Sequence, residues 1–315
     1  MSFLAVSNLS KYRDGNPSVH AISFNQERGE NIAIVGETGS GKTSLLKMIA
    51  GLLQPDEGEM LLNGAPVLGP LYQLIPGHKD IGYLSQHFEL LNHYKVHEVL
   101  DMHRKCSEQA ANDLYQICRI EHLLQRRTDA LSGGERQRIA LAQQLVKSPK
   151  LMLLDEPFSN LDFPHRQMIK QVLKDLRAQQ DKSFIWVSHD AADVLSWADT
   201  MYIMQQGMFL QQGTPVQLYH HPINAYAAGL LGDFNSIIVP DDRIAMIRPE
   251  KMIISSTSDS ETNATIQSID FCGDHFLIGL VAHGKMLRVK TIHANWSVGA
   301  TVHVSWHEED LHYFQ

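Results

Sequence analysis

Gly36-Glu37-Thr38-Gly39-Ser40-Gly41-Lys42-Thr43 decides the fold of this 315-residue chain, because it fits the phosphate-binding pattern G-x-x-x-x-G-K-[ST] at every fixed position. The apolar run 31–35 before it predicts a buried strand, and segment 44–51 after it predicts a helix. Glycines let the backbone wrap a polyphosphate, so that N–H groups and the positive end of the helix dipole point at the anion. The stretch therefore predicts a nucleotide site, in which Lys42 reaches the β- and γ-phosphates and Thr43 offers its hydroxyl to Mg²⁺.

Length and composition limit the possible classes of protein. A chain of 315 residues favours two domains, and a formal net charge of -8 argues against broad nucleic-acid binding and against a polybasic membrane anchor. The three cysteines form no C-x-x-C pair, which favours a reducing cytosol. The sequence shows no signal-peptide pattern and no apolar run long enough to span a bilayer. We therefore expect an acidic soluble protein.

Two adjacent carboxylates follow a second predicted strand. Residues 151–154 are all apolar, which indicates a strand buried on both faces in a parallel sheet, and Asp155 and Glu156 stand at its carboxyl end. Parallel sheets bind ligands at that edge. Asp155 suits the Mg²⁺ shell and Glu156 suits polarising a water for attack on a γ-phosphate. The alternative is an ordinary turn, which leaves the phosphate loop without a metal partner.

Two further predicted strands end in polar side chains that suit the same edge. Segment 81–85 leads to Gln86, whose amide oxygen can ligate Mg²⁺, and segment 184–188 leads to His189, whose imidazole can hydrogen-bond a γ-phosphate. Taken alone, each is typical of a surface residue.

The stretch Ser132-Gly133-Gly134-Glu135 predicts an exposed helix N-terminus. Ser132 suits the N-cap with Glu135 three residues on, which is a capping box before a strong helix former. Two glycines in the first turn cost helix stability and let a ligand approach closely. A helical pattern from about residue 97 to 128 predicts an inserted helical subdomain of about 88–150. In it, His93, His97 and His103 are too unevenly spaced to favour a metal over solvent-facing histidines.

A change in composition near residue 235 predicts a domain boundary. Residues 1–235 alternate strands and helices, whereas residues 236–315 show short strands separated by turns, which suggests a small β-barrel.

The chain resembles the nucleotide-binding subunit of ATP-binding cassette (ABC) transporters. The resemblance rests on features that follow one another in the sequence: the phosphate loop, Gln86, Ser132 to Glu135, the Asp155–Glu156 pair, Asp162 and His189. The resemblance implies an ATPase with a P-loop α/β cassette, comprising a mostly parallel core sheet, an antiparallel β subdomain and a helical insert. It implies that two cassettes meet head to tail. Each ATP would lie between the phosphate loop of one subunit and the helix that begins at Ser132 of the other, called the signature helix.

The same resemblance assigns roles to single residues. It implies that Glu156 is the catalytic carboxylate and that His189 is the switch that responds to the γ-phosphate. It also implies that Gln86 senses Mg²⁺ and the permease. Mg²⁺ would be held by Thr43, Gln86 and Asp155. The implied ATP contacts are Tyr12 as the adenine-stacking aromatic, then Gly36, Glu37, Thr38, Gly39, Ser40, Gly41, Lys42, Thr43, Ser44, Ser132, Gly133, Gly134, Glu135 and Asp162.

The C-terminal part resembles the small TOBE-like, OB-like barrel domain of importer ATPases, through Arg248-Pro249-Glu250 and segment 299–306. The resemblance implies a peripheral subunit on the cytoplasmic side of the cell membrane that drives integral membrane permease subunits. Its other implied partners are an identical cassette and an extracytoplasmic solute-binding protein. Two alternatives remain open: a soluble cassette ATPase that remodels ribosomes or DNA, and an exporter ATPase with a C-terminal β domain. A single cassette and a small barrel speak against the first.

Overall fold

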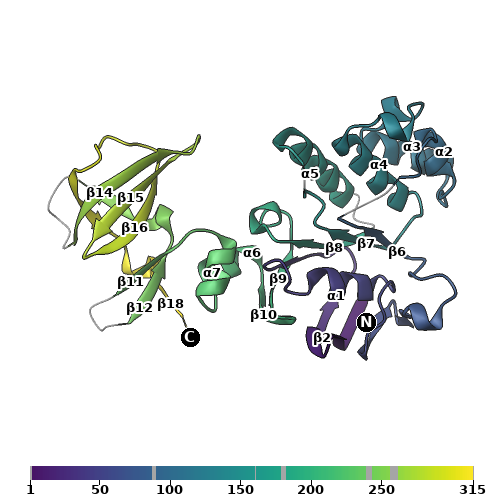
Figure 1. The fold of residues 1–315 in the computed structure, drawn as a ribbon, viewed down its shortest axis with the longest axis horizontal. Helices are drawn as coiled ribbons and strands as arrows, with labels where there is room; N and C mark the ends of the chain where they lie inside the picture. Colours follow the sequence, from purple (N-terminus) through teal and green to yellow (C-terminus); the bar gives the residue numbers. More distant parts are fainter. Residues whose placement is uncertain are drawn as a thin grey trace. The chain divides into compact units, whose positions relative to one another are not determined.

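A mostly parallel sheet of six strands carries the phosphate loop in the computed structural model (Figure 1). The strand order is β10-β9-β3-β8-β7-β6, and β10 pairs antiparallel with β9 while the other pairs are parallel. Every residue of β3, β7 and β8 is buried, because helices and a second sheet cover both faces. The predicted parallel core is confirmed. The strands are β3 (Asn31–Val35), β6 (Ile81–Leu84), β7 (Leu151–Asp155), β8 (Ser183–Ser188), β9 (Thr200–Gln205) and β10 (Met208–Gly213).

The structure describes residues 2–86, 90–159, 161–178, 182–238, 243–255 and 262–314. The chain divides into a first unit, residues 1–215, and a second unit, residues 216–315. α6 (Pro215–His220) begins at this division, and α7 (Ala225–Leu231) belongs to the second unit. The boundary near residue 235 lies after both helices and stays a prediction.

Helices lie on both sides of the central sheet in the first unit. Figure 1 shows α1 (Lys42–Ile49) on one side, and α4 (Gly133–Leu145) and α5 (Phe163–Ala178) on the other. The buried residues of α5 recur at helical spacing, because one stripe of the helix faces the core. These residues are Ile169, Val172, Leu173 and Leu176.

An antiparallel sheet of order β2-β1-β4-β5 packs against α1 and completes the core of the first unit. Leu9 of β1, Leu45 of α1 and Leu153 of β7 belong to one buried cluster. Full burial of each such side chain contributes roughly 1.5–3 kcal/mol. The strands are β1 (Leu4–Arg13), β2 (Asn16–Gln26), β4 (Glu57–Leu62) and β5 (Ala65–Pro66).

The helical insert consists of shorter helices than its apolar pattern predicts. Two short helices, α2 (Val96–Asp101) and α3 (Glu108–Ile117), stand where the pattern runs to about residue 128. Ser107 caps α3 by accepting a hydrogen bond from the Ala110 N–H, so a new helix begins there. Arg119 has a φ of +55°, which ends the helical path soon after α3. His87, Phe88 and Glu89, at the predicted start of the insert, lie outside the described residues.

The second unit is built from antiparallel strands over a core of its own, as predicted. Two sheets, of orders β11-β12-β18 and β13-β17-β14-β15-β16, enclose buried side chains such as Ile247, Ile266 and Leu280. The strands are β11 (Asn235–Ile238), β12 (Ile244–Ile247), β13 (Ile253–Ser255), β14 (Thr262–Phe271), β15 (Phe276–Ala282), β16 (Lys285–Thr291), β17 (Thr301–Ser305) and β18 (His312–Tyr313).

Arg248, which follows β12, ties the sheets of the second unit to α6 and α7. Its side chain is 2% exposed, and its guanidinium donates hydrogen bonds of 2.8–3.3 Å to the carbonyl oxygens of Tyr219, Ala228, Gly232 and Asp233. It also stacks on the Tyr219 ring, 4.1 Å from the ring centroid. Burial lowers the pKa of Arg248, and the carbonyl oxygens solvate its charge.

Arg248→Ala is expected to lower the free energy of unfolding of the second unit by about 3 kcal/mol or more, because it removes the hydrogen bonds that a buried guanidinium donates to four carbonyl oxygens. Urea-dependent hydrogen exchange of β12 and α7 in the full chain measures this loss. Arg288→Ala is the matched control, since the Arg288 side chain is 54% exposed and its pair with Asp233 is a surface ion pair. Equal losses in both variants would contradict the role of Arg248.

Candidate active site

The phosphate loop lies against its neighbours so closely that two positions have no room for a side chain. A Cβ added at Gly36 would lie 2.2 Å from the carbonyl oxygen of Met204, and one at Gly41 would lie 2.1 Å from that of Ser18. Gly39 and Gly41 also have φ values of +88° and +104°, which glycine adopts readily. The loop therefore packs between β9 and the start of β2, and its backbone has the conformation of an anion-binding loop.

Lys42 lies in the first turn of α1 with its ammonium over the loop. Its Nζ donates to the carbonyl oxygens of Gly36 at 2.7 Å and Glu37 at 2.8 Å, and to Ser40 Oγ at 3.3 Å. Burial lowers the pKa of Lys42, while nearby carboxylates oppose the shift. The ammonium is thus held where a phosphate oxygen on the loop would meet it.

Asp155 ends β7 and is bound by hydroxyl groups from two other elements. Thr43 Oγ1 donates to Asp155 Oδ1 at 3.0 Å, and the Tyr83 hydroxyl donates to Asp155 Oδ2 at 2.7 Å. Burial raises the pKa of Asp155, and both hydrogen bonds work against that rise because they favour the carboxylate. Tyr83 is absent from the predicted site, although its place in the strand that leads to Gln86 was a usable signal.

The oxygen donors at this point fit Mg²⁺. Thr43 and Asp155 supply a hydroxyl and a carboxylate, and Gln86 can add an amide oxygen. Over the described residues, no group of three or more His, Cys, Asp and Glu side chains could hold a metal ion. Mg²⁺ usually takes one or two carboxylates together with waters and substrate phosphates, so the donor set suits it.

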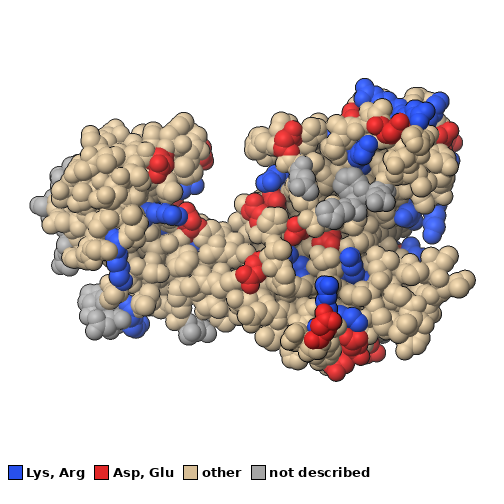
Figure 2. Space-filling view, viewed as in Figure 1, with Lys and Arg blue, Asp and Glu red and all other residues tan. Residues whose placement is uncertain are grey.

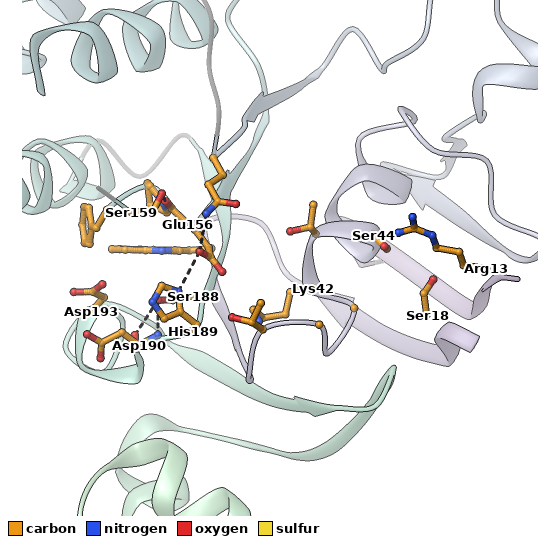
Figure 3. A pocket seen from close by; sticks show the side chains of 18 of the residues that line it. Arg13, Ser18, Lys42, Ser44, Glu156, Ser159, Ser188, His189, Asp190 and Asp193 are labelled. Atoms are coloured by element: carbon orange, nitrogen blue, oxygen red, sulfur yellow. Dashed lines mark hydrogen bonds and ion pairs between the residues drawn. The ribbon is translucent and has the colours of Figure 1, made fainter. Parts of the chain in front are cut away.

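Glu156 contacts two other predicted site residues, Gln86 and His189, and each of the three follows or ends a different parallel strand. Its Oε2 accepts a hydrogen bond of 3.2 Å from Gln86 Nε2 and lies 3.1 Å from His189 Nδ1 (Figure 3). Its φ is +47° and its N–H donates to the Val187 carbonyl oxygen at 3.1 Å. A left-handed conformation outside glycine is uncommon and is held here by the neighbouring strand. The turn after β7 therefore aims this carboxylate at the sheet edge.

A cavity of about 850 Å³ in the first unit connects the phosphate loop to Glu156. Both acidic and basic side chains reach the visible surface of this unit (Figure 2). The predicted residues in the cavity lining are Thr38, Gly39, Gly41, Lys42, Thr43, Ser44, Gln86, Glu156 and His189. The lining also contains Arg13, Asn16 and Ser18 of the β1–β2 hairpin, and Phe158, Trp186, Asp190 and Asp193 beyond Glu156.

The stretch Ser132 to Glu135 forms the capping box that its sequence predicts. Ser132 Oγ accepts from the Glu135 N–H at 3.3 Å, and Glu135 Oε2 accepts from the Ser132 N–H at 2.8 Å. Nothing lies within 4 Å of a Cβ added at Gly133, whereas one at Gly134 would lie 2.1 Å from His165 Cδ2. These residues do not line the cavity, so within one chain this helix end is separate from the phosphate loop.

Asp162 is 61% exposed and precedes α5, outside the cavity lining. Its Oδ1 accepts from the His165 N–H at 3.1 Å and contacts His165 Nδ1 at 2.5 Å, and these hydrogen bonds lower the pKa of Asp162. The carboxylate is thereby oriented at the start of the helix.

Tyr12 does not line the cavity. Its side chain is 37% exposed, and its backbone N–H donates to Asp56 Oδ2 at 2.7 Å. The next residue, Arg13, is the one that lines the cavity. The stacking role that the resemblance gives to Tyr12 stays a prediction.

The three histidines of the insert have separate surroundings. His93 Nδ1 lies 2.9 Å from Arg127 Nη2, and His97 Nδ1 lies 3.0 Å from the Leu124 carbonyl oxygen. Burial lowers the pKa of His103, and the nearby Lys147 adds to that effect. Among the described residues, none of the three joins a metal-ligating group.

Comparison with known protein families gives two matches. Residues 19–159 match the family described as "ABC transporter", and residues 245–314 match the TOBE domain. The chain is 33% identical to an Fe(3+) ions import ATP-binding protein of Haemophilus influenzae, over 98% of this chain and 97% of the relative. It is 30% identical to a spermidine/putrescine import ATP-binding protein of Spiroplasma citri, over 99% of this chain and 97% of the relative.

Solved structures support the fold of the first unit. The ADP conformation of MJ1267, an ATP-binding cassette of an ABC transporter, aligns with a TM-score of 0.62 at 23% identity, covering 73% of this chain and 98% of that chain. The structure of cbiO1 from Clostridium perfringens aligns with a TM-score of 0.60 at 28% identity, covering 69% and 90%. In the part of the chain that the structure describes, no helix has the length and apolarity of a membrane span.

Tyr83→Phe is expected to raise the pKa of Asp155 further, because the carboxylate loses a hydrogen bond that favours its charged form. Metal binding requires the carboxylate, so Mg²⁺-dependent ATP binding should fail at a higher pH in the variant as the pH is lowered. Calorimetric titrations with Mg²⁺ and ATP over a pH series measure this shift. Tyr94→Phe, which changes a half-exposed side chain of the insert, is the control. If Tyr83→Phe loses Mg²⁺-dependent ATP binding at the same low pH as the unchanged protein, that result would contradict the role of Tyr83.

Proposed function

We propose a function for this chain on the premise that it belongs to the ABC transporter family, as an ATP-hydrolysing subunit of the import type. No helix in the described part of the chain could span a membrane. We infer that the chain works with membrane permease subunits and a solute-binding protein, as an import ATP-binding subunit would. We place it on the cytoplasmic side of the membrane, where two copies close on ATP and open after hydrolysis to drive the permease. The relatives are named for Fe(3+), sn-glycerol-3-phosphate and spermidine/putrescine, so ATP-driven import is what they share.

One observation carries the proposal: Glu156 Oε2 meets both Gln86 and His189 in the wall of the cavity that also contains Lys42. The carboxyl ends of β6, β7 and β8 deliver these three side chains to one edge of the sheet. A phosphate held by the loop would therefore face a carboxylate, an amide and an imidazole. This arrangement supports phosphoryl transfer to water.

The phosphate loop binds and orients the nucleotide. Its N–H groups and Lys42 hold the β- and γ-phosphates, while Thr43, Asp155 and Gln86 hold Mg²⁺. When bound, Mg²⁺ neutralises charge on the phosphate oxygens. All three N–H donors of the Lys42 ammonium bond to oxygens of the loop, so a phosphate oxygen would replace at least one of these bonds.

Glu156 acts on the attacking water. Its carboxylate orients the water and takes its proton as the water oxygen bonds to the γ-phosphorus, while the bond from that phosphorus to the β–γ bridging oxygen breaks. The products are ADP and inorganic phosphate. His189, 3.1 Å from the same carboxylate oxygen, contacts the γ-phosphate and links its presence to the position of Glu156.

The second half of each site comes from another copy of the chain. Ser132 and Gly133 are exposed at the N-terminus of α4, where the helix dipole favours an anion, and they lie outside the cavity of their own chain. In a head-to-tail homodimer, residues Ser132 to Glu135 would cover the γ-phosphate held by the partner, and Asp162 would contact the partner. We assign regulation to the β domain beyond residue 235.

Glu156→Gln is expected to lower the turnover of ATP by about 100- to 10,000-fold, because the amide cannot accept the proton of the water. ATP binding should persist, so ATP-bound dimers should accumulate. Steady-state phosphate release and size-exclusion chromatography with Mg²⁺ and ATP measure the two effects. Glu57→Gln, on an exposed carboxylate of β4, should change neither, and near-normal turnover in Glu156→Gln would refute its catalytic role.

Ser132→Arg is expected to leave ATP binding by one chain intact and to block dimer closure, because a long cation replaces the cap where the partner's nucleotide would sit. Ser107→Arg is the matched control, since Ser107 caps α3 in the same way outside the proposed interface. ATP affinity and the ATP-dependent dimer fraction are measured for both variants. A dimer that still closes with Ser132→Arg argues against the cross-subunit site.

A further inference from the structure

The β1–β2 hairpin forms the end of the cavity that lies away from Glu156. Asp14 and Gly15 make its two-residue turn with φ values of +51° and +80°, which is the type I′ pattern. The carbonyl oxygen of Ser18, on the second strand, lies 2.1 Å from where a Cβ on Gly41 would stand. The start of β2 is therefore next to the phosphate loop.

The orientation of a nucleotide follows from the two ends of the cavity. Glu156 and His189 stand at one end, where the γ-phosphate must lie for water to attack it. Because the triphosphate is a linear chain held at Lys42, the ribose and base extend toward the other end. Figure 3 shows Arg13 and Ser18 on the side of Lys42 opposite to Glu156.

The hairpin presents Arg13, and not Tyr12, to that end. Arg13 lines the cavity whereas Tyr12 does not, and the other hairpin residues in the lining are Asp14, Asn16, Pro17 and Ser18. Asp56 holds this orientation, because its carboxylate accepts from the Tyr12 N–H at 2.7 Å and from Lys11 Nζ at 2.8 Å. The stretch before Arg13 is thus anchored to the turn before β4.

Arg13 has a side chain that is free to take a ligand. It is 87% exposed, and its Nε lies 3.9 Å from a carboxylate oxygen of the exposed Asp14, which is a long ion pair. The aromatic side chains in the cavity lining, Phe158 and Trp186, come from the segment after Glu156 and from β8. Among the lining residues of the hairpin, which are Arg13, Asp14, Asn16, Pro17 and Ser18, none has an aromatic ring, and Arg13 is the planar cation.

We propose that the Arg13 guanidinium is the platform on which the base of the nucleotide stacks. This inference rests on the proposed ATP site and adds the residue that receives the base. A guanidinium is planar, delocalised and weakly hydrated, so it stacks on aromatic rings and gains a cation–π attraction that a flexible ammonium on Lys does not reproduce. The platform thus depends on the shape of the cation as well as its charge.

The test compares a ligand with a base and a ligand without one. Titrations of the full chain with ATP and with inorganic tripolyphosphate, each with Mg²⁺, are made for Arg13→Ala and for Arg28→Ala. Arg28 is a matched exposed arginine in the turn after β2, at the opposite end of that strand. Arg13→Ala should weaken ATP binding by about 3- to 30-fold and leave tripolyphosphate binding unchanged. Arg28→Ala should change neither.

Conservative variants separate stacking from charge. Arg13→Tyr should restore most of the ATP affinity because a ring also stacks, whereas Arg13→Lys should not. An equal loss for ATP and tripolyphosphate in Arg13→Ala would overturn the proposal in favour of a phosphate contact. A loss in Tyr12→Ala without one in Arg13→Ala would overturn it in favour of Tyr12. Failure of the proposed function is distinguishable, since the wild-type chain would then bind neither ligand.

Discussion

The close approach of the phosphate loop to β9 and β2 is the constraint on which the rest of the site depends. No side chain fits at Gly36 beside Met204 or at Gly41 beside Ser18, so the loop backbone lies in close contact with both neighbours. A left-handed residue with a Cβ costs roughly 1–2 kcal/mol, and glycine avoids that cost at Gly41. Because the loop contacts both neighbours, Lys42 and Thr43 are placed relative to the sheet edge and to the hairpin at once.

The parallel sheet supplies the opposite wall of the site. In β3, β6, β7 and β8 the chain runs in one direction, so the residues that follow their carboxyl ends meet along one edge. Asp155 is buried there at the cost of desolvating its charge, and hydroxyl groups from Thr43 and Tyr83 offset part of that cost. Glu156 lies one residue further, in a left-handed conformation that turns its carboxylate toward Gln86 and His189.

The proposed nucleotide contacts of a single chain lie in two separate places. The loop and the sheet edge face a common cavity, whereas the capped N-terminus of α4 and the carboxylate of Asp162 stand outside it. Ser132 and Glu135 satisfy each other's backbone N–H groups, and no side chain would crowd a Cβ at Gly133. Local hydrogen bonds thus stabilise this helix end while leaving it open to a charged group from another molecule, which agrees with the proposed head-to-tail assembly.

The sequence by itself determined the features that rest on local physics. Glycine spacing predicted the phosphate loop, unbroken apolar runs predicted β3, β7 and β8, and the family comparisons confirmed the cassette and the C-terminal β domain. Only the tertiary structure placed Tyr83 against Asp155, since that contact joins residues 72 positions apart. It also decided that Arg13 rather than Tyr12 lines the cavity. The stretch before Arg13 is anchored by Asp56, which bonds to Lys11 and Tyr12 and which no local pattern connects to the hairpin.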